Sequence, residues 1–534
     1  MTPSSQNRIK GVFGLALIGL MAVLTLYPTL RFLLLPFLSR SGHLGLAQVS
    51  AVSVRALVNS VRLSVLASTL AIACGVPAAW LMERRRWRGS GALMVSLWLL
   101  FVLPSYLMTA GWQIVFSRTA LAHGALASAF YSQFGIIFLL ALKGLPFATL
   151  AARTSWRAIG AELDDAARLL IRSPILRRAV LLQLLLPSVG AAFAVVFVES
   201  IQEFGIPATL GAQIHLPIVT YAIYERLATT PVNFAGAALL SWQLVGLALL
   251  AVTVQLYIAA RFGGALIHGR RRAVLCPPPD SVEAFCAWSG LGLLVAVGLA
   301  IPLTALVSAA VARQPTAEHL PIAWDSILYS TLYAVLAASL AVAIATPILL
   351  RQRTAGTRYG QMIGALSLTN MALPGIVLGA AYLIAFNSGW LALYGTPLLL
   401  VFAYVAVQVP MLLRFLQAPI EHIHRNLSEA ARLHAVPLSI RLLDVEAPLL
   451  APALTWGWTM AFIQVFFELP ISELLYPAGR APVAVALLWL NQSLDYTSEA
   501  RLALSAMLAA LLVAGAASGL LKFLVRTPLV GEPA

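Results

Sequence analysis

The stretch FAGAALLSWQLVGLALLAVTVQLYIAA, residues Phe234–Ala260, contains no charged side chain. Because an α-helix rises about 1.5 Å per residue, about 20 such residues cross the roughly 30 Å hydrocarbon core of a bilayer. The whole chain of 534 residues is 60% hydrophobic and only 10% charged, a composition that excludes an ordinary soluble globular protein. The stretch therefore predicts a transmembrane helix, and the composition predicts that the chain contains many more.

Apolar runs of similar length recur along the whole sequence, and each of them predicts another span. We expect an all-α membrane protein with twelve transmembrane helices. The shorter apolar run Ala481–Leu494 is expected to re-enter the membrane or to lie at its interface. The expected spans are Gly11–Tyr27 extended to Phe37, Leu63–Met82, Gly91–Phe116, Phe134–Ala152, Ala179–Val198, Phe234–Ala260, Ala284–Ala312, Ser326–Leu350, Met362–Phe386, Thr396–Leu413, Ala447–Phe467 and Leu502–Leu521.

The net charge of +15 at pH 7 is unevenly distributed, because arginine and lysine gather in alternate loops between the expected spans. This alternation is the positive-inside pattern of membrane proteins, in which cytoplasmic loops carry the excess of basic residues. The pattern predicts that both termini are cytoplasmic, and it argues against nucleic acid as a partner. The basic segments are Arg84–Arg88, Arg153–Arg178, Arg261–Arg272, Arg351–Arg358, Arg414–Arg441 and Lys522–Arg526.

Sequence landmarks recur at a nearly constant offset, which indicates two versions of one six-span unit. Pro104 interrupts the third expected span and Pro374 interrupts the ninth, while Glu203 follows the fifth and Glu468 follows the eleventh. An even number of spans in each unit gives both units the same orientation, which defines a parallel repeat. We therefore predict a first repeat over residues 1–265, a cytoplasmic linker over 266–284 and a second repeat over 285–534.

One basic loop motif occurs in both predicted repeats, as AELDDAARLLIRSP at Ala161–Pro174 and as NLSEAARLHAVP at Asn426–Pro437. In the first copy we expect a helix over Thr154–Ile171 and a second helix with Ser173 as its cap and Pro174 as its first residue. Such a helix–break–helix on the cytoplasmic surface offers small alanine side chains and paired charges to another protein. A polar connector that only holds the topology is the alternative, but two copies at equivalent positions favour a docking surface.

The two loops resemble the Glu-Ala-Ala loop of binding-protein-dependent ABC importer permeases, which docks into a cleft of a cytoplasmic ATPase. This resemblance covers essentially the whole chain, as two fused permease domains, and implies the type I ABC importer permease fold. Ile171 and Ala435 stand where the family has glycine. The residues of the two coupling loops are Asp164, Asp165, Ala166, Ala167, Arg168 and Ile171 in the first copy, and Glu429, Ala430, Ala431, Arg432 and Ala435 in the second.

The resemblance also implies the partners of the chain. These are two copies of a cytoplasmic ABC ATPase, one for each loop, an external solute-binding protein, and the lipid of a bacterial inner membrane. ATP and Mg²⁺ belong to the ATPase in such systems, and no cofactor is expected on this chain. The sequence agrees, because it contains no G-x-x-x-x-G-K-[ST] phosphate-binding loop. We therefore expect a transport subunit and not an enzyme.

Polar residues within or beside the expected spans are candidates for the transport pathway, because polar side chains are costly in a membrane. The alternative interpretation of the carboxylates is that they are solvated surface groups at the starts of loops. Lys143, within the fourth span, is expected to snorkel or to pair with a carboxylate. Asn370 is alternatively expected to form a hydrogen bond between helices. The pathway candidates are Glu199, Gln202, Glu203, Gln464, Glu468 and Asn370.

The segments EFGIPATLG at Glu203–Gly211 and FFELPISELLYP at Phe466–Pro477 resemble those of ferric-iron permeases. Ferric iron is therefore the first expected cargo, and importers of thiamine, polyamine and phosphonate are alternatives because they share much of these segments. No resident metal site is expected, because the three cysteines are scattered and have no metal-ligand spacing.

A secondary transporter driven by an ion gradient is the alternative class of protein, since parallel six-span halves also occur in that class. Such a transporter is expected to carry ionisable residues in the middle of its spans for ion coupling. This sequence has almost none there, which favours the ABC permease.

Overall fold

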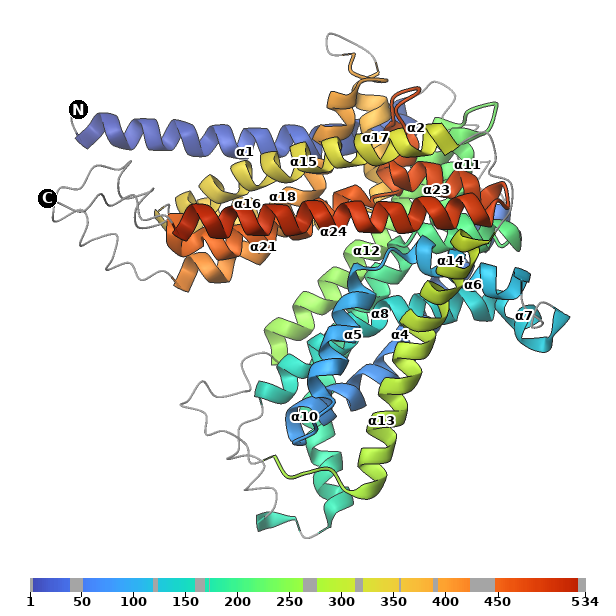
Figure 1. The fold of residues 1–534 in the computed structure, drawn as a ribbon. Coiled ribbons are helices and arrows are strands. Elements are labelled where there is room, and N and C mark those ends of the chain that lie inside the picture. Colours follow the sequence, from blue (N-terminus) through green and yellow to red (C-terminus); the bar gives the residue numbers. More distant parts are fainter. Residues whose placement is uncertain are drawn as a thin grey trace, which may run out of the picture. The chain divides into compact units, whose positions relative to one another are not determined.

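The computed structural model describes residues 3–38, 51–118, 123–158, 169–171, 173–262, 276–312, 320–354, 357–387, 392–422 and 447–526. Over these ranges the chain forms helices joined by short connections, without any strand (Figure 1). A helix satisfies its backbone hydrogen bonds internally, which is what an apolar segment in a bilayer requires. The predicted all-α membrane architecture is confirmed.

The helices fall into two series along the chain. The first series is α1 (Pro3–Leu33), α2 (Leu35–Leu38), α4 (Ala51–Arg84), α5 (Ser90–Val102), α6 (Ser105–Arg118), α7 (Ala125–Phe130), α8 (Gln133–Ala158), α10 (Pro174–Gln202), the π-helix η2 (Pro207–Gly211), α11 (Val219–Ala228) and α12 (Phe234–Phe262). The second series is α13 (Ser281–Val295), the π-helix η4 (Ala296–Ala300), α14 (Ile301–Val311), α15 (Leu320–Thr354), α16 (Thr357–Met371), α17 (Gly375–Ala385), α18 (Pro397–His422), α21 (Ala447–Phe466), α22 (Pro470–Leu475), α23 (Val483–Gln492) and α24 (Tyr496–Arg526).

Ten segments of the described chain are long and apolar enough to cross a membrane as helices. Counting α5 and α6 as one span bent by 97° gives eleven. The predicted ninth span, Met362–Phe386, is divided into α16 and α17, and each of these helices is too short to cross the hydrocarbon core by itself. The expected twelve crossings are therefore not confirmed.

Several helices extend beyond the apolar runs that predicted them. The helix α4 starts at Ala51, whereas the predicted span starts at Leu63, and α24 starts at Tyr496, ahead of the predicted Leu502. An apolar run marks only the part of a helix that lies in hydrocarbon, and polar residues continue the same helix outside it. The predicted helix after Ser173 and the predicted fifth span are likewise one helix, α10, of 29 residues.

Both predicted proline interruptions are breaks between helices. Leu103 leaves α5 with φ −64° and ψ 121°, the extended conformation that a following proline favours. Pro374 is the N-cap of α17, with φ −60° and ψ 144°. Proline has no N–H and its ring clashes with the preceding turn, so a helix cannot continue through it without a kink or a break.

The order of elements repeats along the chain. Each series contains a long helix, a helix pair broken at proline, two further long helices, a helix of 10 residues and a final long helix. A hydrogen bond repeats with them, because Ser60 Oγ accepts from the backbone N–H of Val219 at 2.9 Å and Ser330 Oγ accepts from that of Val483 at 2.8 Å. Val219 and Val483 are the first residues of α11 and α23, so the same contact positions the short helix in both series.

The chain divides into two compact units. Unit 1 comprises Met1–Leu38, Pro315–Leu490 and Leu502–Ala534, and unit 2 comprises Ser39–Gln314 and Asn491–Arg501. Within unit 1, α1 contacts α16, α17 and α18, and within unit 2, α14 contacts α6 while η4 contacts α5. The first helix of each series is therefore packed with the body of the other series. The units follow packing and not chain order, and the boundaries 1–265, 266–284 and 285–534 stay a prediction.

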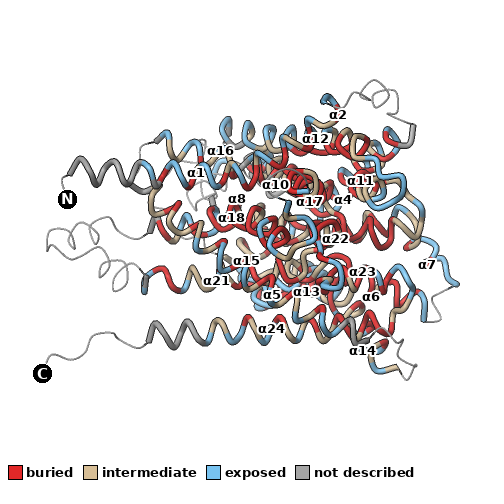
Figure 2. Tube along the Cα trace, turned by 90° about the horizontal axis from the view of Figure 1, so that it is seen from above, coloured by how far each residue is buried: buried red, intermediate tan, exposed pale blue. Residues whose placement is uncertain are grey.

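Large apolar side chains are exposed along the membrane helices. Leu508, Leu511 and Leu512 of α24 are 59%, 65% and 64% exposed. Figure 2 shows buried and exposed positions interleaved along this helix. A continuous apolar surface of this kind is unfavourable in water but matches lipid chains, which are as apolar as leucine.

Small residues bring three helices of unit 2 close together. Ala71 of α4, Ala148 of α8 and Val196 of α10 form one buried cluster. A Cβ atom added at Gly75 would lie 2.8 Å from the Cβ of Ala148 and 3.0 Å from the backbone nitrogen of Thr149. In a membrane, close backbone approach of this kind replaces the hydrophobic effect as the source of helix association.

We predict that Gly75→Leu lowers the stability of the protein, because its side chain would have to displace the backbone of α8. The expected cost is about 1–3 kcal/mol, typical of overpacking. The measurement is the unfolding temperature of the purified chain in detergent. Gly246→Leu in α12 is the matched control, since an added Cβ there meets nothing within 4 Å. Equal unfolding temperatures of the two variants would contradict the packing argument.

Candidate functional site

Glu203 connects three segments of unit 2 through its carboxylate and its backbone carbonyl. Its Oε1 accepts a hydrogen bond from Ser105 Oγ at 2.6 Å and one from the backbone N–H of Gly205 at 2.8 Å. Its backbone carbonyl accepts from Thr220 Oγ1 at 2.9 Å. Ser105 is the first residue of α6, directly after the break at Pro104, and Gly205 begins the next helical segment. A negative charge is favoured there, because unbonded N–H groups and the positive end of the dipole lie at a helix start.

The carboxylate of Glu468 takes the equivalent position in unit 1. Its Oε1 accepts from the backbone N–H of Ile471, and its Oε2 accepts from the N–H and the hydroxyl of Ser472, each at 2.9 Å. Glu468 therefore caps the start of α22. Ser472 also shares a hydrogen bond of 2.7 Å with the hydroxyl of Tyr404 on α18.

The start of α17 lies against this cap, as the start of α6 lies against Glu203. A Cβ atom added at Gly375, the first residue of α17, would lie 3.0 Å from Pro470 Cγ and 3.6 Å from Glu468 Oε1. Each unit thus brings the helix that follows a proline break into contact with a capping carboxylate. The residues that do this are Ser105 and Glu203 in one unit, and Gly375 and Glu468 in the other.

These contacts change the interpretation of the predicted carboxylates. Glu203 and Glu468 are half-buried and hydrogen-bonded, so they are not the solvated surface groups of the alternative interpretation. Glu199, one turn before Glu203 on α10, is exposed and forms no hydrogen bond with the described residues, while Gln202 is half-buried. A role of these residues in the transport pathway stays a prediction.

Lys143 of α8 donates hydrogen bonds to backbone carbonyls at the C-terminal end of α5. Its Nζ donates to the backbone carbonyls of Phe101 and Leu103, both at 2.9 Å. These carbonyls are left open because the helix stops before Pro104, and a positive charge is favoured at a helix C-terminus. The lysine was expected to snorkel or to pair with a carboxylate; its hydrogen bonds go to carbonyls, although Glu199 and Glu203 are close enough to attract it electrostatically.

In unit 1 the corresponding helices, α16, α18 and α21, are joined by hydrogen bonds from uncharged side chains. Asn370, buried near the end of α16, donates from Nδ2 to the backbone carbonyl of Ala406 on α18, which confirms the expected hydrogen bond between helices. Gln408 of α18 donates from Nε2 to Oε1 of Gln464 on α21 at 3.5 Å. The side-chain oxygens of Asn370 and Gln408 are buried and have no partner among the described residues. The surroundings of the two caps therefore differ in charge.

Most of the predicted coupling-loop residues lie outside the described residues. These are Asp164, Asp165, Ala166, Ala167, Arg168, Glu429, Ala430, Ala431, Arg432 and Ala435. The end of the first loop is described: Leu169 and Leu170 are 85% and 83% exposed, and Ile171 is half-buried. Ser173 then caps α10, since its Oγ accepts from the N–H of Leu176 at 3.4 Å, and Pro174 is the first helical residue. This predicted helix start is confirmed.

A buried polar cluster in unit 2 was missed in the sequence. Glu499 of α24 is 1% exposed, and both its oxygens accept from Asn491 Nδ2 at 3.1 Å. The same Nδ2 donates to Oε1 of Gln113 on α6 at 2.8 Å. The signal was a carboxylate directly before a long apolar run, but the predicted span began only at Leu502. In the part of the chain that the structure describes, no three His, Cys, Asp or Glu side chains gather as metal ligands would.

Comparison with known proteins identifies relatives over most of the chain, although no protein-family model matches it. The chain is 25% identical over 533 residues to a Sinorhizobium fredii protein named as a probable ABC transporter permease, covering 91% of this chain and 92% of that protein. It is 22% identical over 307 residues to the ferric transport system permease protein of Actinobacillus pleuropneumoniae, covering 53% and 43%. It is 29% identical over 211 residues to a probable molybdenum ABC transporter permease of Haloferax volcanii, covering 38% and 77%.

These relatives, together with the helical architecture, indicate which class of protein the chain resembles. The chain is a multi-pass membrane protein that resembles ABC importer permeases, ferric transport permeases among them. The relatives support its assignment as a permease subunit of an ABC transporter, a kind of subunit that has no ATPase site of its own.

We predict that Ser105→Ala destabilises the protein, because Glu203 Oε1 would lose the hydroxyl donor at the start of α6 and keep only the backbone N–H of Gly205 among the donors described above. The expected loss is about 1.5–3 kcal/mol, the range for hydrogen bonds to charged groups. The measurement is the free energy of unfolding in mixed detergent. Ser117→Ala is the matched control, since among the described residues that hydroxyl bonds only to Ile114 O within its own helix. If Ser105→Ala lowered the free energy of unfolding no more than the control does, the cap would not depend on Ser105.

Proposed function

We propose that this chain is the membrane subunit of an ATP-driven importer, and that its two repeated loops bind the cytoplasmic ATPase subunits. The observation that supports this most is the acid–Ala–Ala–Arg–Leu motif, which occurs twice in a chain whose relatives are named ABC permeases. The exposed pair Leu169 and Leu170 adds an apolar contact beside the first loop, and exposed apolar pairs outside the membrane favour a protein partner.

The helix that follows the first loop offers a path from the ATPase to the break in the membrane. α10 is a single helix from Pro174, beside the loop, to Gln202, beside the Glu203 cap, with Pro187 in its interior. With 29 residues it is about 43 Å long, so a displacement of the loop moves the cap directly. Glu203 passes the displacement to α6 through Ser105, and Glu468 passes the equivalent displacement to α22 and α17. ATP-driven closure of two ATPase subunits would bias both breaks together.

We predict that Asp165→Arg combined with Glu429→Arg abolishes co-purification of the ATPase while membrane insertion stays intact. Two reversed charges remove the attraction at both loops and add repulsion against the cleft of the partner. Glu225→Arg in α11, an exposed position outside both loops, is the matched control and is expected to retain the ATPase. Full co-purification and uptake by the double variant would refute the docking role.

Ferric iron is the cargo that we propose. One relative is named as a ferric permease, and Glu199 presents an exposed carboxylate on α10 without a hydrogen-bond partner among the described residues. A carboxylate attracts a hard cation such as Fe³⁺, for which oxygen ligands are suitable, and repels oxyanions. The molybdenum permease named among the relatives, and the phosphonate alternative, fit this charge less well. Thiamine and polyamine are cationic, so the experiment must separate them from iron.

We predict that the transporter reconstituted with its ATPase and binding protein takes up Fe³⁺ in preference to thiamine, spermidine, phosphonate and molybdate. Glu199→Gln is expected to lower the initial rate of iron uptake about tenfold, as a loss of about 1.4 kcal/mol of attraction gives. Glu225→Gln, which removes an exposed carboxylate elsewhere, is the matched control. Preferential uptake of another solute would refute iron as the cargo. Uptake driven by an ion gradient with ATP depleted would refute the ATP-driven importer and favour a secondary transporter.

A further inference from the structure

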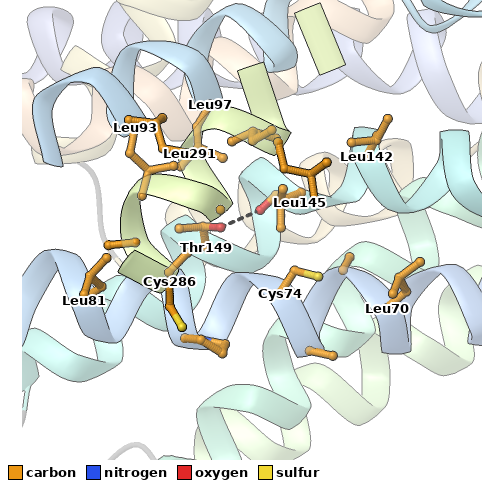
Figure 3. A pocket seen from close by; sticks show the side chains of 18 of the residues that line it. Leu70, Cys74, Leu81, Leu93, Leu97, Leu142, Leu145, Thr149, Cys286 and Leu291 are labelled. Carbon is orange, nitrogen blue, oxygen red and sulfur yellow. Dashed lines mark hydrogen bonds between the residues drawn. The ribbon is translucent and has the colours of Figure 1, made fainter. Parts of the chain in front are cut away.

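A cavity of about 620 Å³ lies within unit 2, between α4, α5, α8 and α13. Leucines from these helices form much of its wall, and Cys74 of α4 and Cys286 of α13 also line it (Figure 3). The polar side chains of the wall are the hydroxyl of Thr149, the carboxylate of Glu283, the thiols of Cys74 and Cys286, and the indole of Trp80; the hydroxyl and the carboxylate are its strongest hydrogen-bonding groups. Thr149 and Glu283 already have hydrogen-bond partners, because Thr149 Oγ1 donates to Leu145 O at 2.8 Å and Glu283 accepts from Arg85 at 2.7 Å.

Contacts between the segment that follows α4 and the helix α13 lie at the end of this cavity where Glu283 forms part of the wall. Arg85 forms two hydrogen bonds of 2.7 Å with the two carboxylate oxygens of Glu283, and this pairing raises the pKa of Arg85. The rings of Trp87 and Trp288 pack edge to face, with 5.3 Å between their centroids. Tryptophan and arginine gather where a membrane protein crosses the headgroup region, and the arginine-rich loop marks this end as cytoplasmic. The cavity therefore extends from the cytoplasmic interface into the hydrocarbon region.

The wall of the cavity decides what can fill it. Water needs two to four polar partners to occupy a cavity. Thr149 and Glu283 already have partners, and the thiols of Cys74 and Cys286 are weak hydrogen-bonding groups. The helices that line the cavity are candidate membrane spans, so lipid chains surround them. Its volume is in the range that holds a small apolar ligand. An acyl chain of the bilayer has the chemistry and the access that this space requires.

Charge at the cytoplasmic end indicates the headgroup. Four arginines there already have partners: Arg84 lies over the Trp156 ring, Arg85 bonds Glu283, and Arg153 and Arg157 both pair with Glu83. Arg86 and Arg88 are exposed, and their side chains form no ion pair with the described residues. Two unpaired guanidinium groups at the interface attract an anionic phosphate and its lipid.

We propose that this cavity binds one anionic phospholipid of the cytoplasmic leaflet, with an acyl chain between α4, α8 and α13 and its phosphate at Arg86 and Arg88. The bound chain fills the space between α13 and the body of unit 2, to which α13 is attached by the Arg85–Glu283 pair. The proposal does not depend on the cargo or on the ATPase.

The test of the acyl-chain site uses the full chain in lipid vesicles that contain a trace of phosphatidylglycerol with a photoactivatable diazirine on its acyl chain. Mass spectrometry is expected to find the label on the segments 70–81 and 282–297. Gly290→Phe places a ring into the cavity, where an added Cβ meets nothing within 4 Å, and is expected to lower this labelling at least fivefold. Gly292→Phe, on the same helix but outside the wall, also has open space and is the matched control.

The headgroup is tested by replacing the probe with phosphatidylcholine carrying the same diazirine. Each arginine near an anionic lipid is worth a factor of about five, so the wild-type chain is expected to favour phosphatidylglycerol clearly. Arg86→Gln with Arg88→Gln is expected to remove this preference, while Arg358→Gln, an exposed arginine of unit 1, is expected to keep it. Equal labelling by both lipids in the wild type, or equal losses in Gly290→Phe and Gly292→Phe, would overturn the proposal.

Discussion

Inside a bilayer, a backbone N–H or C=O group that a broken helix leaves open has no water to bond, and this constraint explains the polar side chains that gather at the two proline breaks of this protein. The chain breaks its helices at Pro104 and Pro374. Lys143 supplies donors to the carbonyls at the end of α5, and Glu203 accepts from the start of α6 and of the next segment. In the other unit, Glu468 caps α22 beside the start of α17. Non-helical backbone at membrane depth is therefore possible because these side chains complete its hydrogen bonds.

The breaks are also where a conformational change can be received. A single helix such as α10, which continues through Pro187, carries a displacement along its axis, whereas two separate helices such as α5 and α6 can change the angle between them. The Glu203 cap connects these two kinds of element, because it ends α10 and bonds the first residue of α6. Glu468 makes the corresponding connection between the end of α21 and α22. The carboxylates thus have a structural task that is compatible with movement at the same positions.

The two units solve the same problem with different charges. In unit 2, Lys143 and Glu199 lie near the cap, and in unit 1 the corresponding elements carry Gln408, Gln464 and Asn370. A charged group in a membrane needs a partner or a helix end of opposite sign, and Lys143 has both the open carbonyls and the nearby carboxylates. In unit 1 the amide side chains form these hydrogen bonds without a charge, so the cost of removing a charged group from water does not arise.

The sequence by itself determined the membrane helices, the two proline breaks, the cap at Ser173 and the repeated positions of Glu203 and Glu468. Each of these follows from the composition of a short segment or from a residue's own backbone geometry, which act locally. Only the tertiary structure decided that Ser105 donates to Glu203, 98 residues away, and that α1 and α13 pack with the bodies of the opposite series. It also decided that Glu499 is buried against Asn491 and Gln113. Such contacts depend on which helix faces meet, and that is fixed by the packing of side chains far apart in the chain.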